Sequence, residues 1–148
     1  MADTTAAAAA SSIDTNFASY MAELKLAGPH WERKPATAAD GEAAWCARQV
    51  AEHIGGAEPF FGAGIAQAIN VPGPTPARLT LESAPDAVAA TEKAHAALMG
   101  VVAQVKDSQM ALAVDHPVLG KQTLGGILAV LSGHLVDHTQ QLKTLRGG

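Results

Sequence analysis

The sequence is poor in cysteine, in aromatic residues and in clustered positive charge. Cys46 is the only cysteine of the 148 residues, so an intramolecular disulfide and a cysteine-based zinc cluster are excluded. The formal net charge is −4, and the ten Lys and Arg residues are scattered along the chain. Because binding to nucleic acid relies on a patch of basic residues, we expect no nucleic-acid partner.

Long hydrophobic runs are missing as well. No stretch of about 18 strongly apolar residues occurs, so we expect no membrane-spanning helix and no membrane partner. The first twelve residues are rich in alanine but lack the basic start and the leucine-rich segment of a signal peptide. Together with the single free cysteine, these absences predict a cytoplasmic protein.

The chain is instead rich in small apolar residues. Its hydrophobic content is 48% and its aromatic content 4%, a balance that favours closely packed helices over a β-sandwich. Apolar residues at helical spacing predict four helices and no strand; the helices are expected at about 12–26, 42–69, 85–105 and 122–146. We therefore predict an all-α four-helix bundle, with residues 12–148 as a single domain and residues 1–11 as a flexible N-terminus.

Two irregularities are expected in this bundle. Gly55, Gly56 and Pro59 should bend or loosen the second helix just after His53, because proline removes a backbone donor and clashes with the preceding turn. The connections on either side of the third helix are each about 15 residues long, and connections of that length often cover a functional site.

A pair of histidines near the end of the chain suggests a metal site. His134 and His138 are four residues apart, so both imidazoles project from one otherwise apolar face of the fourth helix. Burying each imidazole without a partner would cost about 1–3 kcal/mol, which leaves two explanations. Either the two rings are hydrogen-bonded within the core, or they bind a divalent metal together with His53. Three neutral histidines with one open position are typical of a catalytic metal site.

The residues around these histidines resemble a known family. Trp45 is followed eight residues later by His53, and Gly133-His134-Leu-Val-Asp137-His138-Thr-Gln-Gln141-Leu142 follows a Thr-Leu-Gly helix start. These segments are similar to the second-helix and fourth-helix signatures of DinB-like proteins, and the similarity extends over essentially the whole domain. The superfamily includes mycothiol-dependent maleylpyruvate isomerase and related thiol-dependent S-transferases.

The resemblance implies a DinB-like four-helix bundle in which His53, His134 and His138 bind one divalent metal. It also implies a low-molecular-weight thiol as a second cofactor and a small-molecule substrate. Imidazole ligands suit zinc, nickel or iron(II), and also copper(II), better than magnesium or calcium. The function expected on this basis is a metal-dependent, thiol-dependent S-transferase or isomerase. The alternatives are a metal-dependent hydrolase and a non-catalytic bundle that binds a metal or a small ligand.

Four further residues are candidates for substrate binding or for orienting the metal ligands. Glu52 and Asp137 each neighbour a histidine, and each is either a solvated carboxylate or a group that orients an imidazole. Gln141, one turn beyond His138, is a candidate contact for substrate or metal-bound water. His95 is a candidate lining residue; its Glu92-x-x-His95 motif occurs only once, whereas a di-iron bundle needs two.

The remaining notable residues are expected to be structural. Trp45 should lie about 12 Å along the helix axis from His53 and pack in the core. Cys46 has no neighbour that would activate its thiol. His30 and His116 fall in expected loops and receive no role. A homodimer is plausible, because small bundles often bury an apolar face against a second copy.

Overall fold

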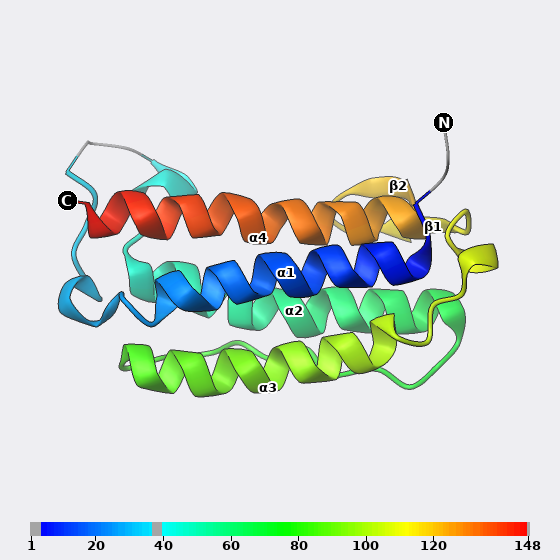
Figure 1. The fold of residues 1–148 in the computed structure, drawn as a ribbon, viewed down its shortest axis with the longest axis horizontal. Coiled ribbons are helices and arrows are strands. Elements are labelled where there is room, and N and C mark those ends of the chain that lie inside the picture. The colour runs from blue at the N-terminus through cyan, green and yellow to red at the C-terminus, as the bar shows by residue number, and fades with distance from the viewer. Residues whose placement is uncertain (1–3, 37–39, 148) are drawn as a thin grey trace.

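The computed structural model describes residues 4–36 and 40–147, and it shows four long helices. They are α1 (Ala6–Leu24), α2 (Ala47–Ile69), α3 (Ala84–Val102) and α4 (Leu124–Arg146). Figure 1 shows α1 and α4 running in one direction and α2 and α3 in the other. α1 packs mainly against α4 and α2 mainly against α3, while contacts between α2 and α4 and between α1 and α3 close the bundle. The predicted all-α four-helix bundle is confirmed.

The first helix begins earlier than predicted. The side chain of Thr5 caps α1 by accepting a hydrogen bond from the backbone N–H of Ala8, so the helix starts at Ala6 and not near Ser12. Residues 6–11, predicted to be flexible, are therefore helical, while residues 1–3 lie outside the described part of the chain. Alanine has the highest helix propensity, and Ala6 and Ala9 are buried, so this run has both a local and a packing reason to be helical.

The second helix begins later than predicted and is not interrupted. A short 3-10 turn (Gly41–Ala44) precedes α2, which then continues through Gly55 and Pro59 to Ile69. Close packing explains the glycine at position 55, because a Cβ atom there would lie 2.5 Å from Cδ1 of Leu79. The glycine thus lets the connection between α2 and α3 lie close against α2, and the predicted loosening after His53 does not occur.

The two long connections take different courses. Because α2 and α3 run in the same direction, residues 70–83 return along the length of the bundle (Figure 1). The connection between α3 and α4 contains a hairpin that the sequence analysis missed, formed by β1 (Ala113–His116) and β2 (Gly120–Thr123). The strands are antiparallel, with His116 opposite Gly120, and Gly120 adopts a positive φ of 74° at the turn.

The core is built mainly from aliphatic residues of all four helices. Its largest fully buried side chains are Ile13, Tyr20, Leu24, Ile54, Ile65, Leu98, Leu124, Ile127, Leu128, Leu131, Leu135 and Leu142. Six of these twelve side chains come from α4, three from α1, two from α2 and one from α3, and with smaller buried residues they form one continuous core. None of the described helices combines the length and the apolar content needed to cross a membrane.

Candidate metal centre

Three histidines from two helices meet on one side of the core. His53 comes from α2, and His134 and His138 come from consecutive turns of α4. The Nε2 atom of His134 lies 2.8 Å from Nε2 of His53 and 3.1 Å from Nε2 of His138. The one-turn spacing on α4 sets one pair, and packing of α2 against α4 adds the third ring.

This donor set suits a single metal ion. One nitrogen from each ring can serve as a ligand, and these three atoms all lie within 4.8 Å of one another. Tetrahedral zinc with nitrogen ligands at about 2.0–2.1 Å requires ligand atoms roughly 3.3 Å apart, so small rotations of the rings would accommodate it. The chemistry of the residues therefore fits a transition-metal site with an open position.

The surroundings keep two of these imidazoles neutral. Burial, followed by the nearby His138 and His53, lowers the pKa of His134 to about 4. Burial and then His138 also lower the pKa of His53, although the carboxylate of Glu42, 3.9 Å away, acts in the opposite sense. A neutral imidazole has the lone pair that a metal requires, so both rings are ready to bind a metal at neutral pH.

Gln141 orients His138 through the ring nitrogen that does not face the other histidines. Nδ1 of His138 lies 2.7 Å from Oε1 of Gln141, and Nε2 of Gln141 donates to the backbone carbonyl of Glu42 at 2.6 Å. Because the Gln141 amide is held through its nitrogen, its oxygen must accept the proton of Nδ1, which leaves the Nε2 lone pair of His138 facing the other histidines. Gln141 therefore contacts the imidazole and lies on its far side from the cluster.

Trp45 lies against the cluster, contrary to expectation. Its ring centroid is 5.0 Å from that of His53 and 6.3 Å from that of His138, with the second pair nearly parallel. The expected separation of two helical turns was wrong because α2 begins only at Ala47. Trp45 precedes the helix, so its side chain can fold back over the two imidazoles and cover part of the cluster.

The two acidic candidates do not contact the histidines. Oε2 of Glu52 accepts hydrogen bonds from Nε of Arg48 at 3.3 Å and from the backbone N–H of Leu81 at 2.8 Å. Glu52 thus anchors the connection between α2 and α3 and orients no imidazole. Asp137 is exposed, and within residues 4–36 and 40–147 its side chain has no hydrogen bond or salt bridge.

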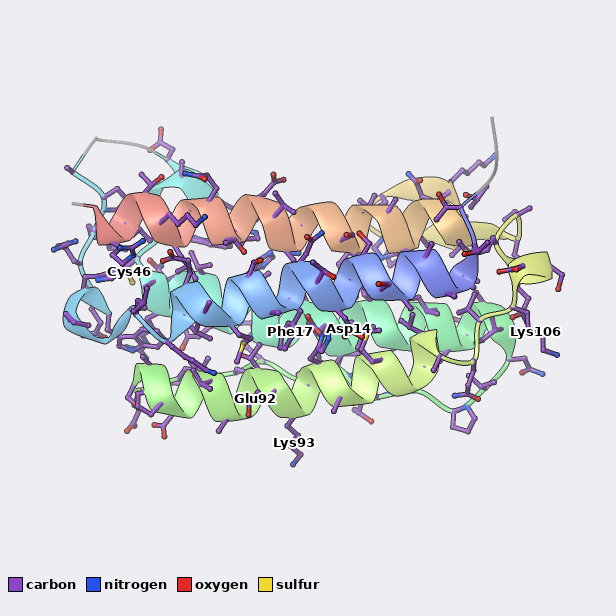
Figure 2. The ribbon with its side chains drawn as sticks, viewed as in Figure 1. Asp14, Phe17, Cys46, Glu92, Lys93 and Lys106 are labelled. Carbon is purple, nitrogen blue, oxygen red and sulfur yellow. The ribbon has the colours of Figure 1, made fainter. Side chains whose placement is uncertain are left out.

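His95 belongs to a different cluster. Its Nδ1 lies 2.8 Å from Oε2 of Glu58, and its Nε2 lies 2.8 Å from Oδ1 of Asp14. Its ring stacks on that of Phe17, with the two ring centroids 3.5 Å apart. Figure 2 shows Asp14 and Phe17 on the side of α1 that faces α3. His95 belongs to α3. The expectation that His95 lines the three-histidine site is therefore wrong, and its Glu92 neighbour is exposed.

A large cavity opens beside the three histidines. It has a volume of about 1140 Å³, and His53 and His134 form part of its wall. The other walls come from α2, from the connection between α2 and α3, and from the hairpin, and they include Phe60, Phe61, Arg78, Leu79, His116 and Leu119. A second cavity of about 540 Å³ reaches His134 and His138 from the side of Asp137 and Gln141. The cluster is thus accessible to a small molecule.

One lining residue, His116, received no role from the sequence. It is buried at the end of β1, and its ring packs 5.6 Å from that of Phe61. Since the hairpin itself was not predicted, no pattern in the sequence placed His116 beside the cavity.

Comparison with models of known protein families identifies the family of this chain. A family model described as the DinB superfamily matches residues 13–142, which include all three histidines. The chain belongs to the DinB superfamily. The resemblance inferred from the Trp45 and His138 segments is thereby confirmed. Comparisons of this DinB protein with curated proteins and with solved structures gave no match.

Proposed function

We propose that this DinB-superfamily protein is a metal-dependent enzyme that acts on a small molecule. In this proposal His53, His134 and His138 hold one divalent transition metal, with zinc, nickel or iron as the preferred ions. The observation that carries the proposal is the convergence of three Nε2 atoms beside a cavity of about 1140 Å³. A metal bound there would supply Lewis-acid chemistry, which lowers the pKa of a bound thiol or water or polarises a carbonyl group.

The protein's own residues prepare the site for that chemistry. Gln141 fixes the tautomer of His138, burial keeps His134 neutral, and Trp45 covers two of the rings. The exposed surface of the cavity walls is largely apolar, which favours a substrate with an apolar body. Thiol-dependent S-transfer or isomerisation is the reaction we propose, on the resemblance to the thiol-dependent members of the superfamily; metal-dependent hydrolysis is the alternative reaction.

A specific observation favours a second candidate, a non-catalytic bundle that binds a small ligand. His134 lies within hydrogen-bond distance of both His53 and His138, so the three imidazoles satisfy part of their own hydrogen-bonding needs without a metal. This candidate predicts that ligand binding survives treatment with a chelator and that no reaction is catalysed.

Cobalt(II) substitution separates these possibilities. We propose loading the chelator-treated protein with cobalt(II) and titrating it with a low-molecular-weight thiol. A thiolate-to-cobalt charge-transfer band that is lost in His134→Ala and kept in Gln140→Ala would support the thiol-dependent enzyme. Gln140 is a matched control, because it is exposed on the same helix. Cobalt uptake without such a band would favour the hydrolase, and no uptake would favour the ligand-binding bundle.

Three wider expectations remain proposals. We propose that residues 12–148 act as one domain, that the protein is cytoplasmic, and that it forms a homodimer. Sedimentation of the purified protein at several concentrations tests the dimer, since a monomer at all concentrations would contradict it.

A further inference from the structure

The imidazole of His116 stabilises the hairpin turn through Nδ1 and leaves its Nε2–H group available as a hydrogen-bond donor. Its Nδ1 atom accepts hydrogen bonds from the backbone N–H groups of Val118, at 3.1 Å, and Leu119, at 3.0 Å. A ring nitrogen that accepts two N–H groups carries no proton of its own, so in the neutral ring the proton resides on Nε2. Across the described parts of the chain, the hydrogen bonds of the His116 side chain involve Nδ1 alone, so this Nε2–H group has no partner within the protein.

The turn alone does not require a histidine. Asparagine and aspartate at the first position of a turn accept hydrogen bonds from the N–H groups two and three residues later, and both are common before proline. His116 precedes Pro117 and makes the same two contacts with Nδ1. Imidazole differs from these shorter side chains because it adds a second nitrogen beyond the turn. That additional donor belongs to a residue that lines the cavity.

His116 lies close to the three-histidine cluster. The ring of Phe61 packs at 5.6 Å from the ring of His116 and at 6.2 Å from the ring of His134. Phe61 therefore packs against both imidazoles, and both line the same cavity. A small molecule with an apolar body against Phe61 can reach the cluster at one end and His116 at the other.

Arg78 supplies a second donor to this cavity. Two arginines line it, and Arg48 is already held by Glu32 at 2.7 Å and by Glu52 at 3.3 Å. Within residues 4–36 and 40–147, no carboxylate pairs with Arg78, which is exposed on the connection between α2 and α3. Glu42 and Glu52 also line the cavity, but Glu52 is paired with Arg48. The guanidinium of Arg78 and the imidazole N–H of His116 are donors without such a partner, and together they form a donor set suited to a carboxylate.

We propose that the cavity binds a small carboxylate with an apolar body, and that Nε2–H of His116 and the guanidinium of Arg78 hold its carboxylate group. The proposal rests on the proposed function in one respect, namely that the reacting end of this molecule lies at His53 and His134. His116 is a positioning residue in this arrangement, because it fixes the substrate and takes no part in ligating a metal.

The test measures carboxylate binding to the metal-free protein, so that a metal cannot supply the binding site. Phenylacetate and hexanoate are titrated calorimetrically into chelator-treated protein, with benzyl alcohol as the neutral control. We expect both carboxylates to bind more tightly than benzyl alcohol. His116→Asn should weaken their binding about tenfold or more, because it keeps the acceptor for the turn and removes the donor in the cavity. Arg78→Gln should have a similar effect, and Arg78→Lys a smaller one.

Two control measurements keep the interpretation clear. The melting temperature of His116→Asn should equal that of the wild type within a few degrees, since the turn keeps its acceptor. Transition-metal uptake should also be unchanged in this variant. Equal carboxylate affinity in wild type and His116→Asn, or no carboxylate binding by the wild type at millimolar concentration, overturns the proposal. If the wild type takes up no transition metal, the proposed function is overturned. Failure of the carboxylate proposal and failure of the proposed function therefore give different results.

Discussion

Gln141 holds His138 in place through a contact of 2.7 Å between Oε1 of the glutamine and Nδ1 of the imidazole. The glutamine is itself fixed, because its Nε2 donates to the backbone carbonyl of Glu42. This chain of contacts connects α4 to the turn before α2, so the segment carrying Trp45 and the helix carrying His138 are positioned together.

The first prediction concerns this contact. Gln141→Ala should lower the affinity for a transition metal by roughly 10- to 100-fold, because His138 loses the group that sets its tautomer and ring orientation. Competition with a chromophoric chelator measures the affinity. Gln140→Ala, one residue earlier and exposed, should bind metal as the wild type does. Equal affinity in both variants would show that Gln141 does not orient the ligand.

The second prediction concerns pH. In the metal-free protein the His134 imidazole should titrate near its pKa of about 4, well below the ordinary value. Because the folded-state pKa is depressed, the folded protein binds fewer protons than the unfolded chain between about pH 6.5 and 4. This histidine therefore stabilises the fold less as the pH falls through that window. Titration of the histidine ring signals by NMR measures the midpoint, and a midpoint above pH 6 would contradict the burial argument.

The third prediction concerns the buried cluster of His95, Glu58 and Asp14. His95→Leu leaves the carboxyl group of Glu58, which is only 1% exposed, without its partner in the core. Loss of one member of a buried ion pair costs about 3–5 kcal/mol, so urea unfolding should show a loss of that order. The double variant His95→Leu/Glu58→Leu should recover much of the lost free energy of unfolding, because it no longer buries an unpaired carboxyl group. Lys93→Ala is the control, because Lys93 points away from the bundle (Figure 2).

The same cluster should respond to alkaline pH. Burial lowers the pKa of His95, but the carboxylates of Glu58 and Asp14 outweigh it, so the net pKa is raised. A raised folded-state pKa gives stability that is present below about pH 6.5 and is lost as the pH rises through the folded value. The difference in unfolding free energy between wild type and the double variant His95→Leu/Glu58→Leu, which leaves no orphaned buried carboxyl group, should therefore be smaller at pH 9 than at pH 6. A difference that grows with pH would contradict this assignment.

The fourth prediction uses two glycines of α2. Gly64→Ala should stabilise the protein by about 0.5–1 kcal/mol, since alanine favours a helix and its Cβ would meet no atom within 4 Å. Gly55→Ala gains the same helix propensity, but its Cβ would displace the side chain of Leu79. Thermal unfolding should show a higher melting temperature for Gly64→Ala and none of that gain for Gly55→Ala. Equal stabilisation of both variants would show that the connection does not press on Gly55.

The sequence predicted the helical features of the site well. The i, i+4 spacing of His134 and His138 depends only on helix geometry, and it places both rings on one face in the structure. His53 was a candidate third ligand from the sequence, but its placement beside α4 depended on the family resemblance, because no local pattern relates α2 to α4. The alanines before Ser12 were misinterpreted because a run of one residue type resembles low complexity, although alanine is also the strongest helix former.

The features that the sequence did not predict depend on tertiary contacts. β1 and β2 each have four residues, too few for an alternating pattern to be distinguished from a loop. Without the hairpin, His116 could not be placed at the cavity. Trp45 was misplaced because it lies between the 3-10 turn Gly41–Ala44 and the start of α2 at Ala47, outside the helix to which the sequence assigned it. His95 was assigned to the wrong cluster, since its partners Glu58 and Asp14 are 37 and 81 residues away.

Metal content is the measurement that tests the central claim most directly. Plasma mass spectrometry on tag-free wild type, His134→Ala and Gln140→Ala would determine the transition metal bound to each chain. We predict about one equivalent in the wild type and in Gln140→Ala, and a large loss in His134→Ala, because the variant removes the nitrogen that lies nearest both other ligands. No bound metal in the wild type after reconstitution, or equal content in all three proteins, would contradict the assignment of His53, His134 and His138 as metal ligands.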